Sequence, residues 1–235
     1  MNVKEVLAEL KDFGNESTKK TLMKHGAKEP FYGVKIADLK KVLKKIKGDQ
    51  DLALKLYETG NSDAMYLAGL AADGGQMTKG KLRDWAKAAY WTYLSEYTVP
   101  WVASESKHGW DLSLEWIDSK KENIASAGWA SLGSIVMTSP NEDLDLKALG
   151  KLLKRVEKDI QSSQNRVRYT MNGFVIAVGS YVKPLSQEAV KTAKKIGTVE
   201  VEMGGTACKV PFAPEYIKKA KARGSLDKKK KTAKC

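Results

Sequence analysis

The sequence is poor in the residues that build disulfide frameworks and metal sites. Its 235 residues include two cysteines, Cys208 and Cys235, and two histidines, His25 and His108, and neither pair has a metal-binding spacing. So few cysteines cannot supply a disulfide framework or a structural zinc site. We therefore expect a cytosolic protein that binds no metal and needs no cofactor.

Long apolar runs and nucleotide-binding motifs are also missing. No apolar stretch reaches the roughly 18 residues that a membrane-spanning helix needs. No glycine-rich phosphate loop, HExxH, CxxC or Ser-His-Asp signature appears, and the Gly-Gly pairs at 74–75 and 204–205 are better explained as turns. These absences argue against membrane insertion and against nucleotide- or metal-dependent enzymes.

Acidic residues are outnumbered, and the basic excess is concentrated at one end. The chain has 41 Lys and Arg against 28 Asp and Glu, a formal charge of +13, and residues 218–235 supply about +8 of it. We expect a single folded domain over 1–222 and a basic, disordered tail over 223–235. Such a tail raises affinity for any polyanion, which makes Lys228, Lys229, Lys230 and Lys231 candidate DNA contacts and favours nucleoid association.

Helical periodicity covers most of the chain. Apolar residues recur at three- and four-residue steps, and short Gly-, Pro-, Asn- or Ser-containing connections separate the periodic segments. This pattern predicts an all-α fold of stacked helical hairpins, an α-solenoid, although a compact irregular bundle is also compatible with it. Helices are expected over 4–12, 36–47, 51–58, 64–72, 79–94, 112–117, 124–137, 144–160, 165–181 and 187–196.

One segment departs from the helical pattern. Residues 198–210 alternate apolar and polar side chains on both sides of Gly204-Gly205. This predicts a small β-hairpin with a two-residue turn, lying against the helices. The hairpin either has a structural role or enters a ligand groove. In the second case, Lys209 is a candidate contact to the DNA backbone.

The stretch EYTVPWVASESKHGWD places Trp101 four residues before Glu105. Four residues is about one helical turn, so both side chains share a face if the segment is helical. Small and polar neighbours and the preceding Pro100 favour an indole on an open surface. The alternative is that Glu105 only complements the dipole at the start of a helix.

The stretch NRVRYTMNGFVIAVG, residues 165–179, combines arginines with a deeply apolar continuation. In a helix, Arg168 and Asn172 share one face, and burial of the apolar run holds the first turns rigidly. Arginine on a rigid turn suits phosphate contacts, which makes Arg166 and Arg168 candidates. Salt bridges to Glu157 or Asp159 are the alternative.

These segments resemble a known family, the bacterial DNA alkylation repair proteins, which are HEAT-like-repeat relatives of alkylpurine DNA glycosylases. The resemblance covers nearly the whole chain and is strongest in EYTVPWVASES, WIDSKKENIASAGW, NRVRYTMNGFVIAVG and IGTVEVEMGGTACKVP. It implies an all-helical solenoid whose concave, basic face holds duplex DNA. The glycosylase branch uses a tryptophan and an aspartate four residues later, with an arginine and a second tryptophan.

Transferred onto this sequence, the catalytic set is incomplete. Trp101 matches the first tryptophan and Glu105 replaces the aspartate, whereas Ser126 stands for the arginine and Phe174 for the second tryptophan. The extra methylene of glutamate moves the carboxylate by about 1 Å, and a misplacement of this size can lower the reaction rate about a hundredfold. The pattern resembles the branch of the family that binds DNA, including branched DNA, without evident base excision.

Three functions follow from this interpretation. The first is a monomeric repair protein that binds damaged or branched double-stranded DNA on a concave basic face, with weak or no base excision. The second is an N-glycosylase that releases cationic alkylpurines with Glu105 as the carboxylate. The third is a helical scaffold for other proteins, with a tail that retains nucleic acid. Trp101, Glu105, Arg166, Arg168 and Asn172 are expected to line or flank the concave face.

Overall fold

The computed structural model describes residues 1–235 and is built from helices without a β-strand. Most expected helices are present, and three more lie outside the expected ranges, over residues 16–24, 99–105 and 213–222. The α-helices are α1 Val3–Asp12, α2 Glu16–Lys24, α3 Ile36–Ile46, α4 Gln50–Glu58, α5 Ser62–Ala71, α6 Lys79–Ala88, α7 Val99–Glu105, α8 Gly109–Trp116, α9 Glu122–Thr138, α10 Leu146–Asp159, α11 Asn165–Tyr181, α12 Ser186–Ile196 and α13 Ala213–Ala222. None of them is long and apolar enough to cross a membrane.

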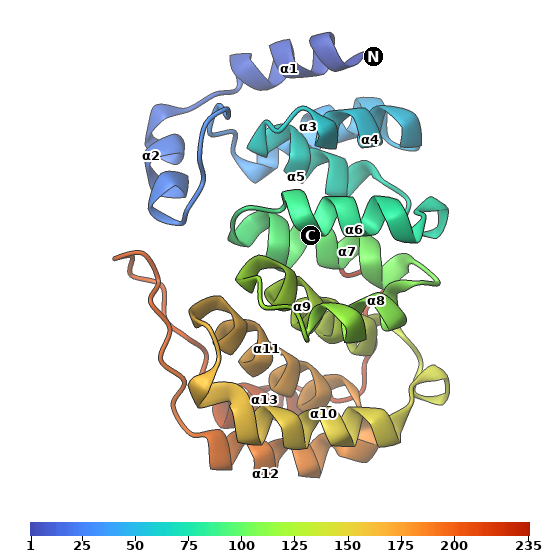
Figure 1. The fold of residues 1–235 in the computed structure, drawn as a ribbon, viewed down its shortest axis with the longest axis vertical. Coiled ribbons are helices and arrows are strands. Elements are labelled where there is room, and N and C mark those ends of the chain that lie inside the picture. Colours follow the sequence, from blue (N-terminus) through green and yellow to red (C-terminus); the bar gives the residue numbers. More distant parts are fainter.

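The helices stack along the long axis of the molecule from α1 to α12 (Figure 1). Helices α5, α7, α9, α11 and α13 pack on one another in succession, and we call them the inner row. Helices α4, α6, α8, α10 and α12 pack against members of that row. Their apolar faces form two large buried clusters, one in each half of the stack. The predicted all-α architecture is therefore confirmed.

Polar caps explain where several helices begin. The Asn2 side chain accepts from the Glu5 N–H while Glu5 reaches back to the Asn2 N–H, a reciprocal capping box. Asn61 and Thr78 accept from the third residue beyond them and so start α5 and α6. These caps satisfy N–H groups that no carbonyl inside the helix can reach.

The helix expected through residue 94 is two elements. Helix α6 ends at Ala88, and the chain resumes with a π-helical turn, η2 Leu94–Thr98, that leads directly into α7. The hydroxyl of Thr98 donates to the Tyr93 carbonyl inside this wide turn. Single π-turns inside helices are frequent at functional sites.

Residues 198–212 do not form the predicted β-hairpin. Gly204 and Gly205 make the expected turn, with φ of 69° and 66°, but the two limbs exchange no backbone hydrogen bonds with each other. Polar side chains of the helices bond the limbs instead: Asn165 pairs with both backbone groups of Glu202, and Asn172 donates to the Pro211 carbonyl. Figure 1 shows the segment rising beside the stack toward α2.

The chain beyond α13 lies along the body, although the sequence favours a disordered tail. The Asp227 N–H donates to the Ser180 carbonyl at 3.0 Å, and the Lys230 N–H donates to the Met137 carbonyl at 2.9 Å. The C-terminus thereby returns from the α12 end of the stack to its middle, near α6 and α7 (Figure 1).

Candidate nucleic-acid interface

A row of aromatic side chains follows the π-turn into α7. Tyr93, Tyr97, Trp101 and Glu105 are spaced four residues apart, and their helical segments carry them along one surface. Ring centroids of Tyr93 and Tyr97 lie 5.8 Å apart, and those of Tyr97 and Trp101 lie 6.2 Å apart. Tyr66 of α5 completes the row, with its ring edge-on to Trp101 at 5.2 Å.

The members of this row differ in exposure. Tyr97 is 40% exposed, whereas Trp101 is only 4% exposed beneath its neighbours. The expectation of an open indole at Trp101 is therefore wrong, because Tyr66 and Tyr97 cover it. Tyr97 offers the accessible ring face of the row.

A buried ion pair fixes the π-turn to α11. Arg166 donates from Nε and Nη2 to the two carboxylate oxygens of Glu96 at 2.7 and 2.6 Å. The guanidinium also lies over the Tyr169 ring, 4.4 Å from its centroid. Burial raises the pKa of the Glu96 carboxyl, and the hydrogen bonds and charge of Arg166 oppose that rise. The partner of Arg166 is thus Glu96, and neither Glu157 nor Asp159.

A cavity of about 550 Å³ opens beside this pair. Its walls come from the end of α2, the π-turn, the start of α11 and the 198–212 segment, and they include Lys24, Tyr97, Arg166, Tyr169 and Lys209. A Cβ at Gly204 would overlap the Lys24 carbonyl oxygen, so the tip of the segment touches the end of α2. Cationic and aromatic groups from distant parts of the chain therefore surround one hollow.

Glu105 is the last residue of α7 and is exposed, with 31% of its side-chain surface accessible. It therefore cannot complement the N-terminal dipole of that helix. Its Oε2 accepts from the Gly74 N–H at 3.3 Å and from the Lys234 ammonium at 2.8 Å. The carboxylate lies one turn beyond Trp101, as the spacing predicts, but a lysine of the tail is paired with it.

Three of the candidate DNA contacts lie inside the protein. Ser126 of α9 and Asn172 of α11 are fully buried, and Phe174 packs against Trp129 with ring centroids 5.3 Å apart. The amide of Asn172 holds the Pro211 carbonyl. In this conformation Ser126, Asn172 and Phe174 cannot touch DNA, because surrounding side chains cover them.

The remaining candidate cations differ in accessibility. Lys209, Lys228, Lys230 and Lys231 are exposed, whereas the Lys229 ammonium donates to the Val136 carbonyl at 2.9 Å. Burial lowers the pKa of Lys229. Arg168 is half-buried and forms no salt bridge, and its Nε has no hydrogen-bond partner.

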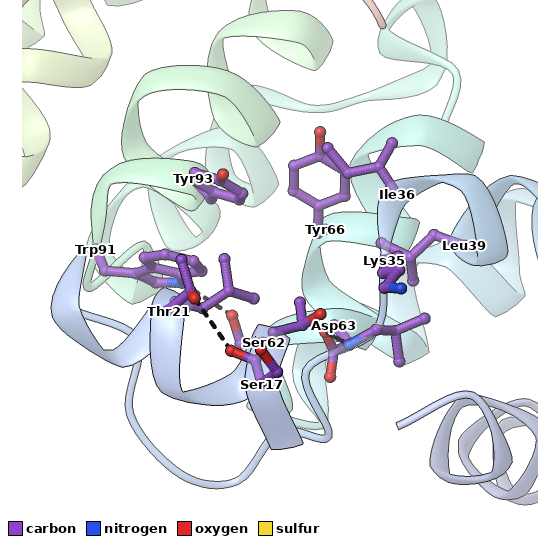
Figure 2. Close-up of a pocket in the computed structure, with 13 residues that line it drawn as sticks. Ser17, Thr21, Lys35, Ile36, Leu39, Ser62, Asp63, Tyr66, Trp91 and Tyr93 are labelled. Atoms are coloured by element: carbon purple, nitrogen blue, oxygen red, sulfur yellow. Dashed lines mark hydrogen bonds between the residues drawn. The ribbon is translucent and has the colours of Figure 1, made fainter. Parts of the chain in front are cut away.

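A second hollow lies on the other side of Tyr66 and Tyr93. It has a volume of about 380 Å³ between α2, α3 and the aromatic row. Figure 2 shows Trp91 donating to Ser62 at its base, with Tyr66 and Tyr93 facing the hollow. Asp63 accepts from the N–H groups of Tyr32, Gly33 and Val34, so its carboxylate is committed to holding the α2–α3 connection.

No group of three or more His, Cys, Asp or Glu side chains is arranged to hold a metal ion. Sequence inspection missed Tyr66, Glu96, Tyr97 and Lys234 as members of the site. Tyr97 was detectable from its four-residue spacing to Trp101. Tyr66 and Lys234 are distant in sequence, and no local pattern connects them to Glu105.

Comparison with known proteins agrees with this architecture. The model of the DNA alkylation repair enzyme family matches residues 6–216. The chain belongs to this family. An uncharacterized protein of Listeria innocua and one of Listeria monocytogenes are each 34% identical over 221 residues, covering 92% of this chain and 95% of each relative.

A solved structure shares the whole fold. It covers 100% of both chains with a TM-score of 0.92 and 36% sequence identity. That protein is described as representing a new family related to the HEAT-like repeat DNA glycosylases, with affinity for branched DNA structures. The HEAT-like character of the solenoid is thereby confirmed for this member of the alkylation repair family.

Proposed function

We propose that this protein binds damaged or branched DNA along the surface of its inner row, with weak or no base excision. The observation that carries the proposal is the convergence of Lys24, Lys209 and exposed Tyr97 around one hollow, beside the Glu96–Arg166 pair. The affinity of its solved relative for branched DNA supports the same conclusion.

The chemistry of the hollow suits DNA backbone and unpaired bases. Lys24 and Lys209 provide exposed ammonium groups, which suit contacts to phosphates that do not depend on base sequence. Tyr97 presents a ring on which a base freed from pairing at a branch point can stack. Recognition would then follow the shape and deformability of the DNA, with little sequence preference.

Loss of base excision is supported by what surrounds Glu105. The serine that replaces the family arginine is buried, so no guanidinium approaches from that position of α9. Phe174 is buried against Trp129 and offers no second indole. The carboxylate of Glu105 is itself paired with Lys234, which reduces its power to stabilise a cationic sugar in the transition state.

Titration of a labelled DNA junction with the full chain and with a chain ending at Gly224 tests this proposal. The truncation removes five lysines and one aspartate. We expect the body to retain most of the affinity, with binding of both chains falling steeply as salt increases. Loss of nearly all binding on truncation would instead support a protein scaffold whose tail alone retains nucleic acid.

A second candidate function is release of cationic N-alkylated purines. It is favoured by one observation, the position of the Glu105 carboxylate one helical turn beyond Trp101. Single-turnover base release from a duplex with an N-methylpurine, measured with protein in excess, separates the two functions. Free methylated base that disappears in Glu105→Gln would establish the enzyme, whereas tight binding without release would establish the non-excising function.

The protein is further proposed to act as a monomer associated with the nucleoid. A formal charge of +13 and a single continuous stack of helices support this. Light scattering that gives the mass of one 25.9 kDa chain would agree with it. A stable dimer or a distribution that excludes the nucleoid would contradict it.

A further inference from the structure

The last residues of the chain occupy the surface beside Trp101. The Lys234 ammonium lies 2.8 Å from Oε2 of Glu105 and 2.5 Å from the Ala72 carbonyl oxygen. The Cys235 thiol lies 3.3 Å from the Tyr66 hydroxyl. A carboxylate and a carbonyl, from the inner row and its immediate end, thus hold the Lys234 cation, while the Tyr66 hydroxyl contacts the neighbouring Cys235.

The path of the tail follows the carboxyl ends of successive helices. Its backbone or side chains bond Ser180 of α11, Val136 and Met137 of α9, and Ala72 at the end of α5. The last carbonyls of a helix have no partner within it and carry partial negative charge, so they attract ammonium groups. This explains how a basic tail adheres to a protein that is itself basic.

Lys234 differs from the other lysines of the tail. Its side chain is 17% exposed and forms the only salt bridge between the tail and the body. Lys228, Lys230 and Lys231 remain exposed. The contact at Glu105 is therefore specific to one lysine, whereas the others keep their charge available to solvent.

We propose that Glu105 and the Ala72 carbonyl form a subsite for a compact cation, filled in the free protein by Lys234. The tail therefore covers Glu105 and the Tyr66 hydroxyl until DNA displaces it. The displacement step rests on the proposed DNA-binding function, whereas occupation of the subsite by Lys234 does not.

The contact is weak enough to be exchanged. Glu105 keeps 31% of its side chain exposed, and a partly exposed ion pair contributes little net stability. A DNA phosphate backbone offers the released ammonium a denser array of negative charge. The apparent affinity for DNA then depends on the fraction of molecules in which Lys234 has left Glu105. Only that fraction can bind, so a smaller fraction gives a proportionally lower apparent affinity.

The full-length variants Lys234→Gln and Lys231→Gln provide a charge-matched test. Each loses one positive charge from the same tail, but only Lys234 contacts Glu105. Counterion release alone predicts equal weakening of binding to a DNA junction. The proposal predicts that Lys234→Gln binds the junction roughly three- to tenfold more tightly than Lys231→Gln.

Hydrogen exchange of the tail gives a second readout that needs no DNA. The Lys230 N–H, bonded to the Met137 carbonyl, is expected to exchange several-fold faster in Lys234→Gln and Glu105→Gln than in Lys231→Gln. Equal exchange in all three variants would overturn the cation subsite. In the unmodified protein, addition of the junction is expected to accelerate the same exchange.

The outcomes separate this inference from the function on which it partly rests. DNA binding with unchanged tail exchange, or equal affinities of the two lysine variants, would overturn displacement while leaving DNA binding intact. Faster exchange in Lys234→Gln without any DNA binding would support the subsite and overturn the proposed function.

Discussion

Tyr97 and Trp101 have different roles within the same aromatic row. Trp101 is covered by Tyr66 and Tyr97, so its indole supports the surface from below. Tyr97 is the member with an accessible face. The resemblance singled out Trp101, but the structure shows that Trp101 packs beneath Tyr97, and Tyr97 is the side chain that solvent can reach.

Replacing Tyr97 by Ala is therefore expected to weaken binding of branched DNA. Loss of one base-stacking ring costs about 1–3 kcal/mol, so the dissociation constant should rise by about fivefold or more. Tyr90→Ala serves as the control, because Tyr90 is 36% exposed beside α4 and α6, outside both the aromatic row and the inner row of helices. Equal effects of the two substitutions in an equilibrium titration would contradict a specific role for the row.

The Glu96–Arg166 pair lends itself to a stability prediction. Arg166→Met leaves a buried carboxylate without its partner, and such a change costs about 3–5 kcal/mol in unfolding free energy. Pairing it with Glu96→Gln should restore part of that loss, because no charge is then left buried. Denaturant unfolding of the single and double variants measures both effects.

An exposed pair of similar geometry supplies the control. Arg83 and Glu115 are also joined by two hydrogen bonds, but both side chains are more than 40% exposed. Arg83→Met should therefore cost less than about 1 kcal/mol. Similar losses for Arg83→Met and Arg166→Met would show that burial of the Glu96 pair is unimportant.

At the scale of elements, the sequence predicted the regular helices correctly. Its prediction was wrong for a segment whose conformation depends on contacts with distant residues. Helices α3 and α10 have cleanly periodic apolar faces, and the structure confirms them. The alternation in 198–210 is equally clear, yet side chains of Asn165 and Asn172 take the backbone bonds that a hairpin would use. The alternation of apolar and polar residues within 198–210 does not reveal that side chains of α11 will bond this backbone.

The two glycines at the tip of this segment test its contact with α2. Gly204 and Gly205 have nearly equal positive φ values, but only Gly204 abuts the Lys24 carbonyl. Alanine at either position carries a similar backbone strain of about 1 kcal/mol. Gly204→Ala must in addition push the tip away from α2.

We therefore expect Gly204→Ala to reduce junction affinity by several-fold more than Gly205→Ala, because it displaces Lys209 from the hollow. The dissociation constants of the two variants for the same junction, measured under the same conditions, test this prediction. A larger effect from Gly205→Ala would show that the contact between the tip and α2 does not shape the binding surface.

At the scale of the whole molecule, charge and helix stacking were predictable, but the return of the tail was not. Composition identifies a basic end with strong attraction for polyanions. It does not reveal that carboxyl ends of successive helices line up to receive that end, since their alignment is a property of the folded stack. The four-residue spacing of Trp101 and Glu105 was informative, whereas the cation beside Glu105 comes from 129 residues further along the chain.

Competition between a four-way DNA junction and a linear duplex of the same length and base composition tests the central claim most directly. A surface that combines phosphate contacts with a stacking ring for unpaired bases should prefer the junction by about tenfold or more. The preference should persist as salt weakens both complexes. Equal affinity for the two DNAs, or binding of neither, would contradict the account.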